Sequence, residues 1–159
     1  VKVGPLIENK AIDKVEKHVA AIKADDGRVL TGGARHDLGG RFFQPTVTLG
    51  GDDALFREEE TFGPMIPVFA FDTEEEALAI ANDTIYGLTN YVQTQDGARR
   101  NRLARQLKAG MIEMNGVSRG RGSAFGGVKA SGRAREGGVW GLEEFMDSKQ
   151  ISGWDAEAE

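Results

Sequence analysis

The residues best suited to chemistry lie in the acidic segment Arg57-Glu58-Glu59-Glu60-Thr61-Phe62-Gly63-Pro64. A carboxylate next to an aromatic ring, held by a Gly-Pro turn ahead of a buried strand, can accept hydrogen bonds from two ribose hydroxyls while the ring covers a flat heterocycle. Three acids before an apolar strand are also common as solvated surface charges. The segment therefore predicts either a nucleotide contact or an ordinary polar turn.

A second candidate is the glycine-rich segment from Ala124 to Gly138. Ten of the chain's 22 glycines lie between Gly110 and Gly141, so several backbone positions there need a positive φ or a close approach to another group. The segment can be a tight loop that leads into a helix. It can also let the backbone approach a ligand, in which case Phe125 would project into a cavity.

One segment has the residue spacing of a serine-hydrolase motif but lacks the structural context that the motif needs. Gly116-Val117-Ser118-Arg119-Gly120 matches a G-x-S-x-G nucleophile elbow and follows an expected strand. The elbow needs a helix directly after it, whereas more glycines follow, and the catalytic histidine should come after the serine. Both histidines, His18 and His36, precede Ser118. The order of the residues therefore argues against a serine hydrolase.

Basic side chains cluster between Gly97 and Arg135, which carry a net charge of about +9 and leave about −14 on the rest of the chain. Clustered cations can bind a phosphate backbone, but Phe125 is the only aromatic residue in this stretch, so a base-stacking surface is not favoured. The alternatives are a solvated or interface-forming helix face and a specific anion site. We expect no nucleic-acid partner.

Composition excludes several classes of protein. The chain has no cysteine and two histidines, so it holds no disulfide, no thiolate metal site and no cysteine nucleophile, and we expect no metal. The longest apolar run, Met65–Phe71, is too short to cross a membrane, and 40% apolar residues suit one soluble domain. The chain lacks a signal-peptide pattern and an initiating Met, so we expect a cytoplasmic protein whose numbering begins inside a longer chain.

Hydrophobic spacing predicts helices that alternate with strands. Helices are expected over 9–24, capped by Asn9, over 73–83 with a Thr73 capping box, over 96–110 capped by Asp96, and along a stripe from Val139 to Met146. Strands are expected over 28–31, 41–49, 65–71, 88–94, 111–114 and 148–154.

This alternation predicts an α/β fold with a mostly parallel twisted sheet flanked by helices. Met65–Phe71 is almost continuously apolar, which is typical of a strand covered on both faces. The terminal strand Ser148–Trp154 has no hairpin partner nearby in the sequence. We therefore expect it to pair outside the domain, with a distant strand or with a second chain.

Five ordered motifs make the chain resemble the NAD(P)-dependent aldehyde dehydrogenase superfamily. They cover essentially the whole chain, and together they are far more specific than any one of them. The motifs are Gly4-Pro5-Leu6-Ile7, Phe43-Gln44-Pro45-Thr46-Val47, Glu59-Glu60-Thr61-Phe62-Gly63-Pro64, Asn82-Asp83-Thr84-Ile85-Tyr86-Gly87-Leu88, and Phe125-Gly126-Gly127-Val128-Lys129-Ala130-Ser131-Gly132 followed by Arg135-Glu136.

The resemblance implies a carboxy-terminal part of such an enzyme. Residues 1–147 would be part of the catalytic domain, and residues 148–159 an oligomerisation strand with an acidic tail. Members of the family use a cysteine thiolate to oxidise an aldehyde to a carboxylate through a thioester, with NAD or NADP as hydride acceptor. That cysteine would lie upstream, so no catalytic residue is expected here and the isolated chain is expected to be inactive.

The resemblance also assigns four site residues by position. Glu60 matches the acid that binds the nicotinamide-ribose hydroxyls, and Phe62 the aromatic residue beside the nicotinamide. Phe125 matches an aromatic residue of the substrate tunnel, and Arg119 falls near the aldehyde entrance, where it could bind a substrate carboxylate or be a solvated loop cation. Ala134 replaces a glycine that is common in the family, which predicts strain in its loop.

The resemblance leaves the substrate and the assembly open. The region from Arg28 to Gly40 is most similar to succinate-semialdehyde-type members, so a small aldehyde, including a semialdehyde, is the expected substrate. The expected partner is a second copy of the chain, in a dimer or a tetramer. The alternative is a non-catalytic interaction module that pairs through its terminal strand.

Overall fold

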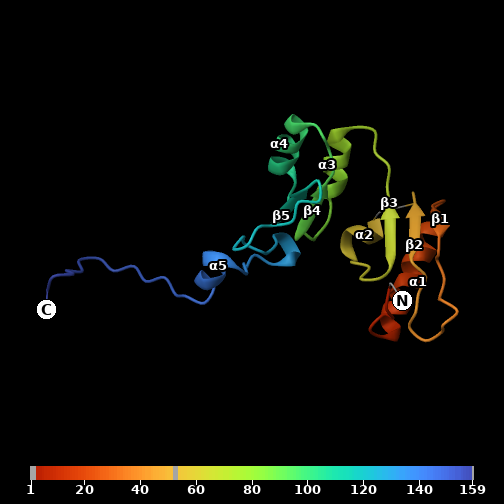
Figure 1. Ribbon diagram of the computed structural model, residues 1–159, viewed down its shortest axis with the longest axis horizontal. Helices are drawn as coiled ribbons and strands as arrows, with labels where there is room; N and C mark the ends of the chain where they lie inside the picture. Colours follow the sequence, from red (N-terminus) through yellow and green to blue (C-terminus); the bar gives the residue numbers. More distant parts are fainter. Residues whose placement is uncertain (1–2, 52–53, 159) are drawn as a thin grey trace. The chain divides into compact units, whose positions relative to one another are not determined.

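The structure is a computed structural model that describes residues 3–51 and 54–158 (Figure 1). The chain divides into two compact units, Val1–Ile85 and Tyr86–Glu159. Each unit combines helices with one small sheet, which confirms the predicted α/β class. In the described part of the chain, the strands form these two separate sheets, and two of the three strand pairs are parallel.

The first unit contains a three-stranded sheet in the order β1-β2-β3. Strand β2 pairs antiparallel with β1 and parallel with β3. Pro67 lies in β3, an edge strand, where a missing N–H is tolerated. The elements are α1 (Asn9–Ala24), β1 (Arg28–Thr31), β2 (Thr46–Leu49), α2 (Ala54–Glu58), β3 (Met65–Val68) and α3 (Glu74–Asn82).

The core of the first unit lies between α1 and the sheet. The predicted apolar stripe of α1 is buried, and it packs with Phe43 and with Met65 of β3. Its residues are Ile12, Val15, Val19 and Ile22. The expected Asn9 cap is wrong: Glu8 is the N-cap residue and makes no side-chain cap bond, so this helix is stabilised by the burial of its stripe rather than by a cap.

Strand β3 is not covered on both faces in the described structure, contrary to the sequence prediction. Met65 is 6% exposed and packs in the core, whereas Ile66 is 63% exposed and Val68 is 40% exposed. Successive side chains of a strand point to opposite faces, and α1 covers one of them. The strand also ends at Val68, three residues before the predicted end.

The predicted Thr73 cap of α3 is confirmed, although the capping box around it is not complete. The Thr73 Oγ1 atom accepts a hydrogen bond from the Glu76 N–H at 3.1 Å, and the Glu76 carboxylate accepts one from the Asp72 N–H at 2.7 Å. The first bond satisfies an N–H group in the first turn of the helix, whereas the second goes to Asp72, one residue before the N-cap, rather than to Thr73.

The second unit contains the parallel pair β4 and β5. Asp96 caps α4 as predicted, because its Oδ1 atom accepts hydrogen bonds from the N–H groups of Ala98 at 2.8 Å and Arg99 at 3.1 Å. The helix ends at Gln106, before the predicted end at Gly110. The elements are β4 (Thr89–Val92), α4 (Gly97–Gln106), β5 (Met111–Met114), the 3-10 helix η1 (Lys129–Ser131) and α5 (Gly138–Glu143).

The glycine-rich segment packs against the backbone next to β4 and β5. The Gly87 carbonyl accepts hydrogen bonds from the N–H groups of Gly110 at 3.0 Å and Val128 at 2.9 Å. A Cβ atom on Gly110 would lie 2.0 Å from the Gly126 carbonyl oxygen, closer than any real contact. Glycine at position 110 therefore permits the close approach that the sequence predicted for this segment.

The carboxyl-terminal residues differ from the prediction. The apolar stripe near α5 is exposed, with Leu142 at 67% and Phe145 at 92%. The expected strand over Ser148–Trp154 is not formed, and residues 147–158 have no helix or strand. An extended segment becomes a strand only with a hydrogen-bonding partner, and within the described residues none lies alongside this one. Pairing with a second chain stays a prediction.

Candidate functional site

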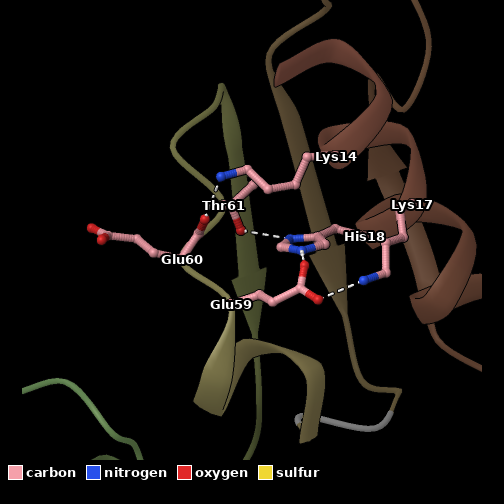
Figure 2. A network of polar contacts seen from close by, with 6 residues as sticks. All are labelled: Lys14, Lys17, His18, Glu59, Glu60 and Thr61. Carbon is pink, nitrogen blue, oxygen red and sulfur yellow. Dashed lines mark hydrogen bonds and ion pairs between the residues drawn. The ribbon is translucent and has the colours of Figure 1, made fainter. Parts of the chain in front are cut away.

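The acidic segment predicted to contact a nucleotide lies between α2 and β3. Its two candidate residues are both exposed, Glu60 by its side chain and Phe62 by 74% of its surface. The neighbouring side chains of Glu59 and Thr61 point the other way, toward α1, and in Figure 2 the Glu60 carboxylate extends away from that network. The segment thus alternates between residues that bind α1 and residues that face outward.

His18 is the buried centre of this network. Its side chain has no exposed surface, and its ring packs edge-on against Phe56, with the ring centroids 5.0 Å apart. The Nδ1 atom lies 2.9 Å from the Thr61 Oγ1 atom, and the Nε2 atom lies 3.3 Å from a carboxylate oxygen of Glu59 (Figure 2). Both ring nitrogens are therefore satisfied within the segment 59–61.

Two lysines one turn apart on α1 add further contacts. The Lys17 ammonium donates to the Glu59 carboxylate at 2.5 Å, and the Lys14 ammonium donates to the Glu60 backbone carbonyl at 2.8 Å. The hydrogen bond from Lys17 is the main reason that the pKa of Glu59 lies below its ordinary value, and the His18 contact acts in the same direction. Glu59 is thus ionised near neutral pH and accepts hydrogen bonds only.

Phe62 has an unusual backbone conformation. Its φ of +46° lies in the left-handed region, which is rare for a bulky residue. The next residue, Gly63, packs directly on α1: a Cβ there would lie 2.4 Å from a methyl carbon of Val15. Strained residues of this kind persist where surrounding contacts hold them, and they cluster at binding sites. The Phe62 ring is exposed, and the Lys14 ammonium lies 6.0 Å from its centroid.

These two side chains can perform the predicted chemistry. The Glu60 carboxylate has two acceptor oxygens, enough for two adjacent hydroxyl donors, and an exposed ring such as that of Phe62 can cover a flat heterocycle. The 3–51 and 54–158 ranges contain no group of three His, Cys, Asp or Glu residues placed to hold a metal ion.

Protonation of His18 is expected to destabilise the fold. Burial lowers the pKa of His18 below its ordinary value near 6.5; the charges of Lys17 and Lys14 act in the same direction, and the Glu59 contact only partly opposes them. Because the folded state binds this proton less readily than the unfolded state, the contribution to stability is complete above about pH 6.5 and is lost as the pH falls.

We therefore expect the free energy of unfolding to fall between about pH 7.5 and about pH 5.5, by at most about 1.4 kcal/mol per pH unit for this one proton. Urea unfolding at the two pH values measures it. The variant His18→Gln has no titrating ring and should show a weaker pH dependence. An equal dependence in the two proteins would contradict the prediction.

In the second unit, the structure brings together the two predicted substrate residues. The Arg119 guanidinium carbon lies 4.4 Å from the centroid of the Phe125 ring, within the range of a cation–π contact. Arg119 is exposed and lines an open pocket along β5 with Arg100 and Met114, whereas Phe125 is half-buried. That Phe125 projects into a cavity stays a prediction, and the structure shows only that its ring has a positively charged neighbour.

Phe125 is held by its backbone. Its N–H and carbonyl exchange hydrogen bonds with Glu136, at 2.8 and 2.7 Å, which closes the glycine-rich loop at its base. The Arg135 guanidinium lies inside that loop and donates to the Gly127 carbonyl at 2.7 Å. Ala134 does not have a positive φ, so the expected strain at that position is not found.

The sequence singled out the outward-facing residues but not those that hold them. The sequence patterns gave no binding role to His18, Lys14 or Lys17, and Thr61 entered only as part of the acidic segment. One signal was available: His18 is three residues after Val15 and four before Ile22, within the buried stripe. A polar ring in such a stripe needs hydrogen-bonding partners from another part of the chain.

The sequence model of the Aldehyde dehydrogenase family matches residues 1–151. The chain, an α/β protein with an exposed acid–aromatic pair and a glycine-rich loop, belongs to the aldehyde dehydrogenase family.

Its relatives include several semialdehyde dehydrogenases. It is 44% identical over 153 residues to glutarate-semialdehyde dehydrogenase of Pseudomonas aeruginosa (95% of this chain, 32% of the relative) and 47% identical over 150 residues to human mitochondrial succinate-semialdehyde dehydrogenase (93% and 28%). It is 42% identical over 153 residues to the NADP(+) succinate-semialdehyde dehydrogenase of Escherichia coli (95% and 32%). The chain thus spans about a third of the length of these relatives.

Solved structures show the same fold. An aldehyde dehydrogenase from Bartonella henselae aligns with a TM-score of 0.88 and 44% identity, over 96% of this chain and 33% of the other. A Mycobacterium tuberculosis aldehyde dehydrogenase complexed with NAD+ aligns with a TM-score of 0.85 and 37% identity, over 96% and 33%.

Proposed function

We propose that this chain is a carboxy-terminal part of an NAD(P)-dependent aldehyde dehydrogenase that oxidises an aldehyde to a carboxylate through a thioester. Family membership and the exposed pair of Glu60 and Phe62 support the proposal. The chain contains no cysteine, so the nucleophile would come from another part of the protein. Residues 1–147 would belong to the catalytic domain.

Glu60 and Phe62 would bind the nicotinamide half of the cofactor. The bound cofactor would supply the hydride acceptor. The Glu60 carboxylate would accept hydrogen bonds from the two ribose hydroxyls, and Phe62 would lie against the flat nicotinamide ring. The E. coli relative is named for NADP(+) and the M. tuberculosis structure contains NAD+, so the proposal covers both cofactors.

The proposed substrate is a small aldehyde with a carboxylate at its far end. The names of the relatives, which include glutarate- and succinate-semialdehyde dehydrogenases, support this class. Arg119 would bind the distal carboxylate through its forked N–H groups, and Phe125 would support the guanidinium from its other face. A solvated Arg119 remains the alternative that the variant below tests.

We expect Arg119→Ala, made in the intact protein, to lower kcat/KM for a semialdehyde by about 30-fold, which corresponds to about 2 kcal/mol of lost charge-assisted bonding. A neutral aldehyde of equal length should be barely affected. Arg121→Ala is the matched control, because it removes an exposed arginine two residues away. Equal losses for the two substrates would mean that Arg119 supports the loop and does not bind the substrate.

Residues 148–159 would join this chain to another copy. The terminal segment has no strand partner in the described chain, and the exposed apolar residues near α5 would be buried in a dimer or a tetramer. A cytoplasmic location stays a prediction. Among the described residues, no helix has the length and apolar character to span a membrane.

Assay of the intact protein tests the proposed function. With succinate- or glutarate-semialdehyde and either NAD+ or NADP+, purified protein should form reduced cofactor, and alkylation of its cysteines should abolish the reaction. The alternative, a non-catalytic module that pairs through its terminal strand, predicts no reaction and no cysteine-bearing segment in the intact protein. Failure to reduce either cofactor with any aldehyde would favour that alternative.

A further inference from the structure

His18 is a buried polar residue of α1 whose side-chain hydrogen-bonding partners lie outside that helix. It is fully buried on the face of α1 that packs against the sheet, yet both of its polar atoms bind residues more than 40 positions away. A buried imidazole costs free energy unless its nitrogens are paired. The two partners, Glu59 and Thr61, flank Glu60 in the sequence. The histidine thus fixes the backbone on both sides of a residue proposed to bind the cofactor.

The protonation of the network follows from its partners. An ionised Glu59 only accepts, so the His18 Nε2 atom must carry the proton and donate it toward that carboxylate. In a neutral ring the Nδ1 atom then accepts a hydrogen bond from the Thr61 hydroxyl. This arrangement sets one orientation of the ring and one direction for the Thr61 side chain.

We propose that His18 is a positioning residue, which holds the segment from Glu59 to Gly63 on α1 so that the Glu60 carboxylate and the Phe62 ring face the cofactor. The proposal rests on the proposed function. The side chains of Glu59 and Thr61 both point toward α1, so Glu60, which lies between them, is turned outward, and the left-handed backbone of Phe62 leaves its ring exposed. In Figure 2 the side chains of Glu59 and Thr61 point toward His18, whereas the Glu60 carboxylate points away from it.

The other contacts of the segment are weaker substitutes for His18. Lys17 forms an exposed ion pair with Glu59, which contributes little to stability, whereas Lys14 donates to a backbone carbonyl, that of Glu60, rather than to a charged group. The buried histidine is held by packing on Phe56 as well as by hydrogen bonds. Phe62, at a φ of +46°, needs such a support on its amino-terminal side, because relaxation of its backbone would redirect the ring.

The test measures cofactor affinity in the intact protein, by the fluorescence of the reduced cofactor on titration. His18→Leu keeps a similar volume and removes both hydrogen bonds, and Thr61→Val removes one hydroxyl only. We expect about a tenfold weaker Kd for His18→Leu and a smaller weakening for Thr61→Val. Amide hydrogen exchange of residues 59–63, measured without cofactor, should accelerate in both variants.

Ile22→Ala is the matched control, because it empties a fully buried site on the same helix beside Gly27 and Gly51. It should lower the Tm at least as much as His18→Leu while leaving cofactor affinity and exchange of residues 59–63 unchanged. His18→Gln, which can offer one donor and one acceptor, should recover part of the affinity. If His18→Leu does not fold, Thr61→Val gives the decisive measurement.

The outcomes separate the two proposals. If Glu60→Gln weakens cofactor binding but His18→Leu and Thr61→Val weaken it no more than Ile22→Ala, then His18 is merely structural and the positioning role is overturned. If Glu60→Gln has no effect on binding, the proposed cofactor site itself is wrong, and the role of His18 fails with it. Weaker binding in all three site variants, with the control unchanged, supports both.

Discussion

A polypeptide of these 159 residues is expected to form no reduced cofactor with any aldehyde. It contains no cysteine, and without a thiolate no covalent adduct forms from which a hydride could leave. Binding of cofactor or substrate cannot replace that step. Enzymes of ordinary efficiency turn over about 10 times per second, so an absorbance assay at micromolar protein detects a residual rate many orders of magnitude lower.

The isolated chain must be shown to be folded for this result to count. Its circular dichroism should contain the helical signal of α1, α3 and α4, and a full-length relative assayed under the same conditions is the positive control. Cofactor reduction that co-purifies with the chain, and scales with its concentration, would refute the proposed division of the active site between this chain and a cysteine-bearing segment.

Replacing Glu60 with glutamine in the intact protein is expected to slow hydride transfer about 100-fold. Glutamine preserves the size of the side chain but removes the negative charge, so the bonds to two ribose hydroxyls lose about 3 kcal/mol. A misplaced nicotinamide also departs from the geometry that hydride transfer needs. Phe62→Ala should act in the same direction, because it removes the exposed ring that would lie beside the nicotinamide.

Pre-steady-state formation of reduced cofactor measures this effect directly, since it separates hydride transfer from product release. Glu75→Gln, which removes an exposed acid from α3, is the control for a general change of surface charge. Unchanged transfer rates in both Glu60→Gln and Phe62→Ala would remove these residues from the cofactor site, whatever the steady-state kcat shows.

Short-range sequence patterns were sufficient to predict most of the helices and strands. The caps at Thr73 and Asp96 were predicted and confirmed, because a side chain that accepts from an N–H two or three residues later depends on nearby residues only. The stripe of α1 and the strand Met111–Met114 were likewise read from short-range spacing. Asn9 failed as a cap because propensity at a helix start is a weak signal beside the burial of the stripe.

Pairing of strands was less predictable. Spacing identified apolar runs but could not say that they form two small sheets, or that the terminal segment lacks a partner in the described chain. Hydrogen bonds between strands join residues far apart in sequence, and their register depends on the packing of whole elements. The exposure of Ile66 in β3 was unpredictable for a similar reason, because the second face of a strand is buried only where another layer of the fold covers it.

The sequence by itself determined which residues of this protein could do chemistry: its motifs placed an acid beside an aromatic ring at Glu60 and Phe62, and an aromatic ring in the glycine-rich loop at Phe125. Only the tertiary structure decided how they are held. The contacts of His18 with Glu59 and Thr61, and of Arg119 with Phe125, depend on where the backbone folds back. No periodic pattern encodes such contacts, because each depends on the direction of single side chains after packing.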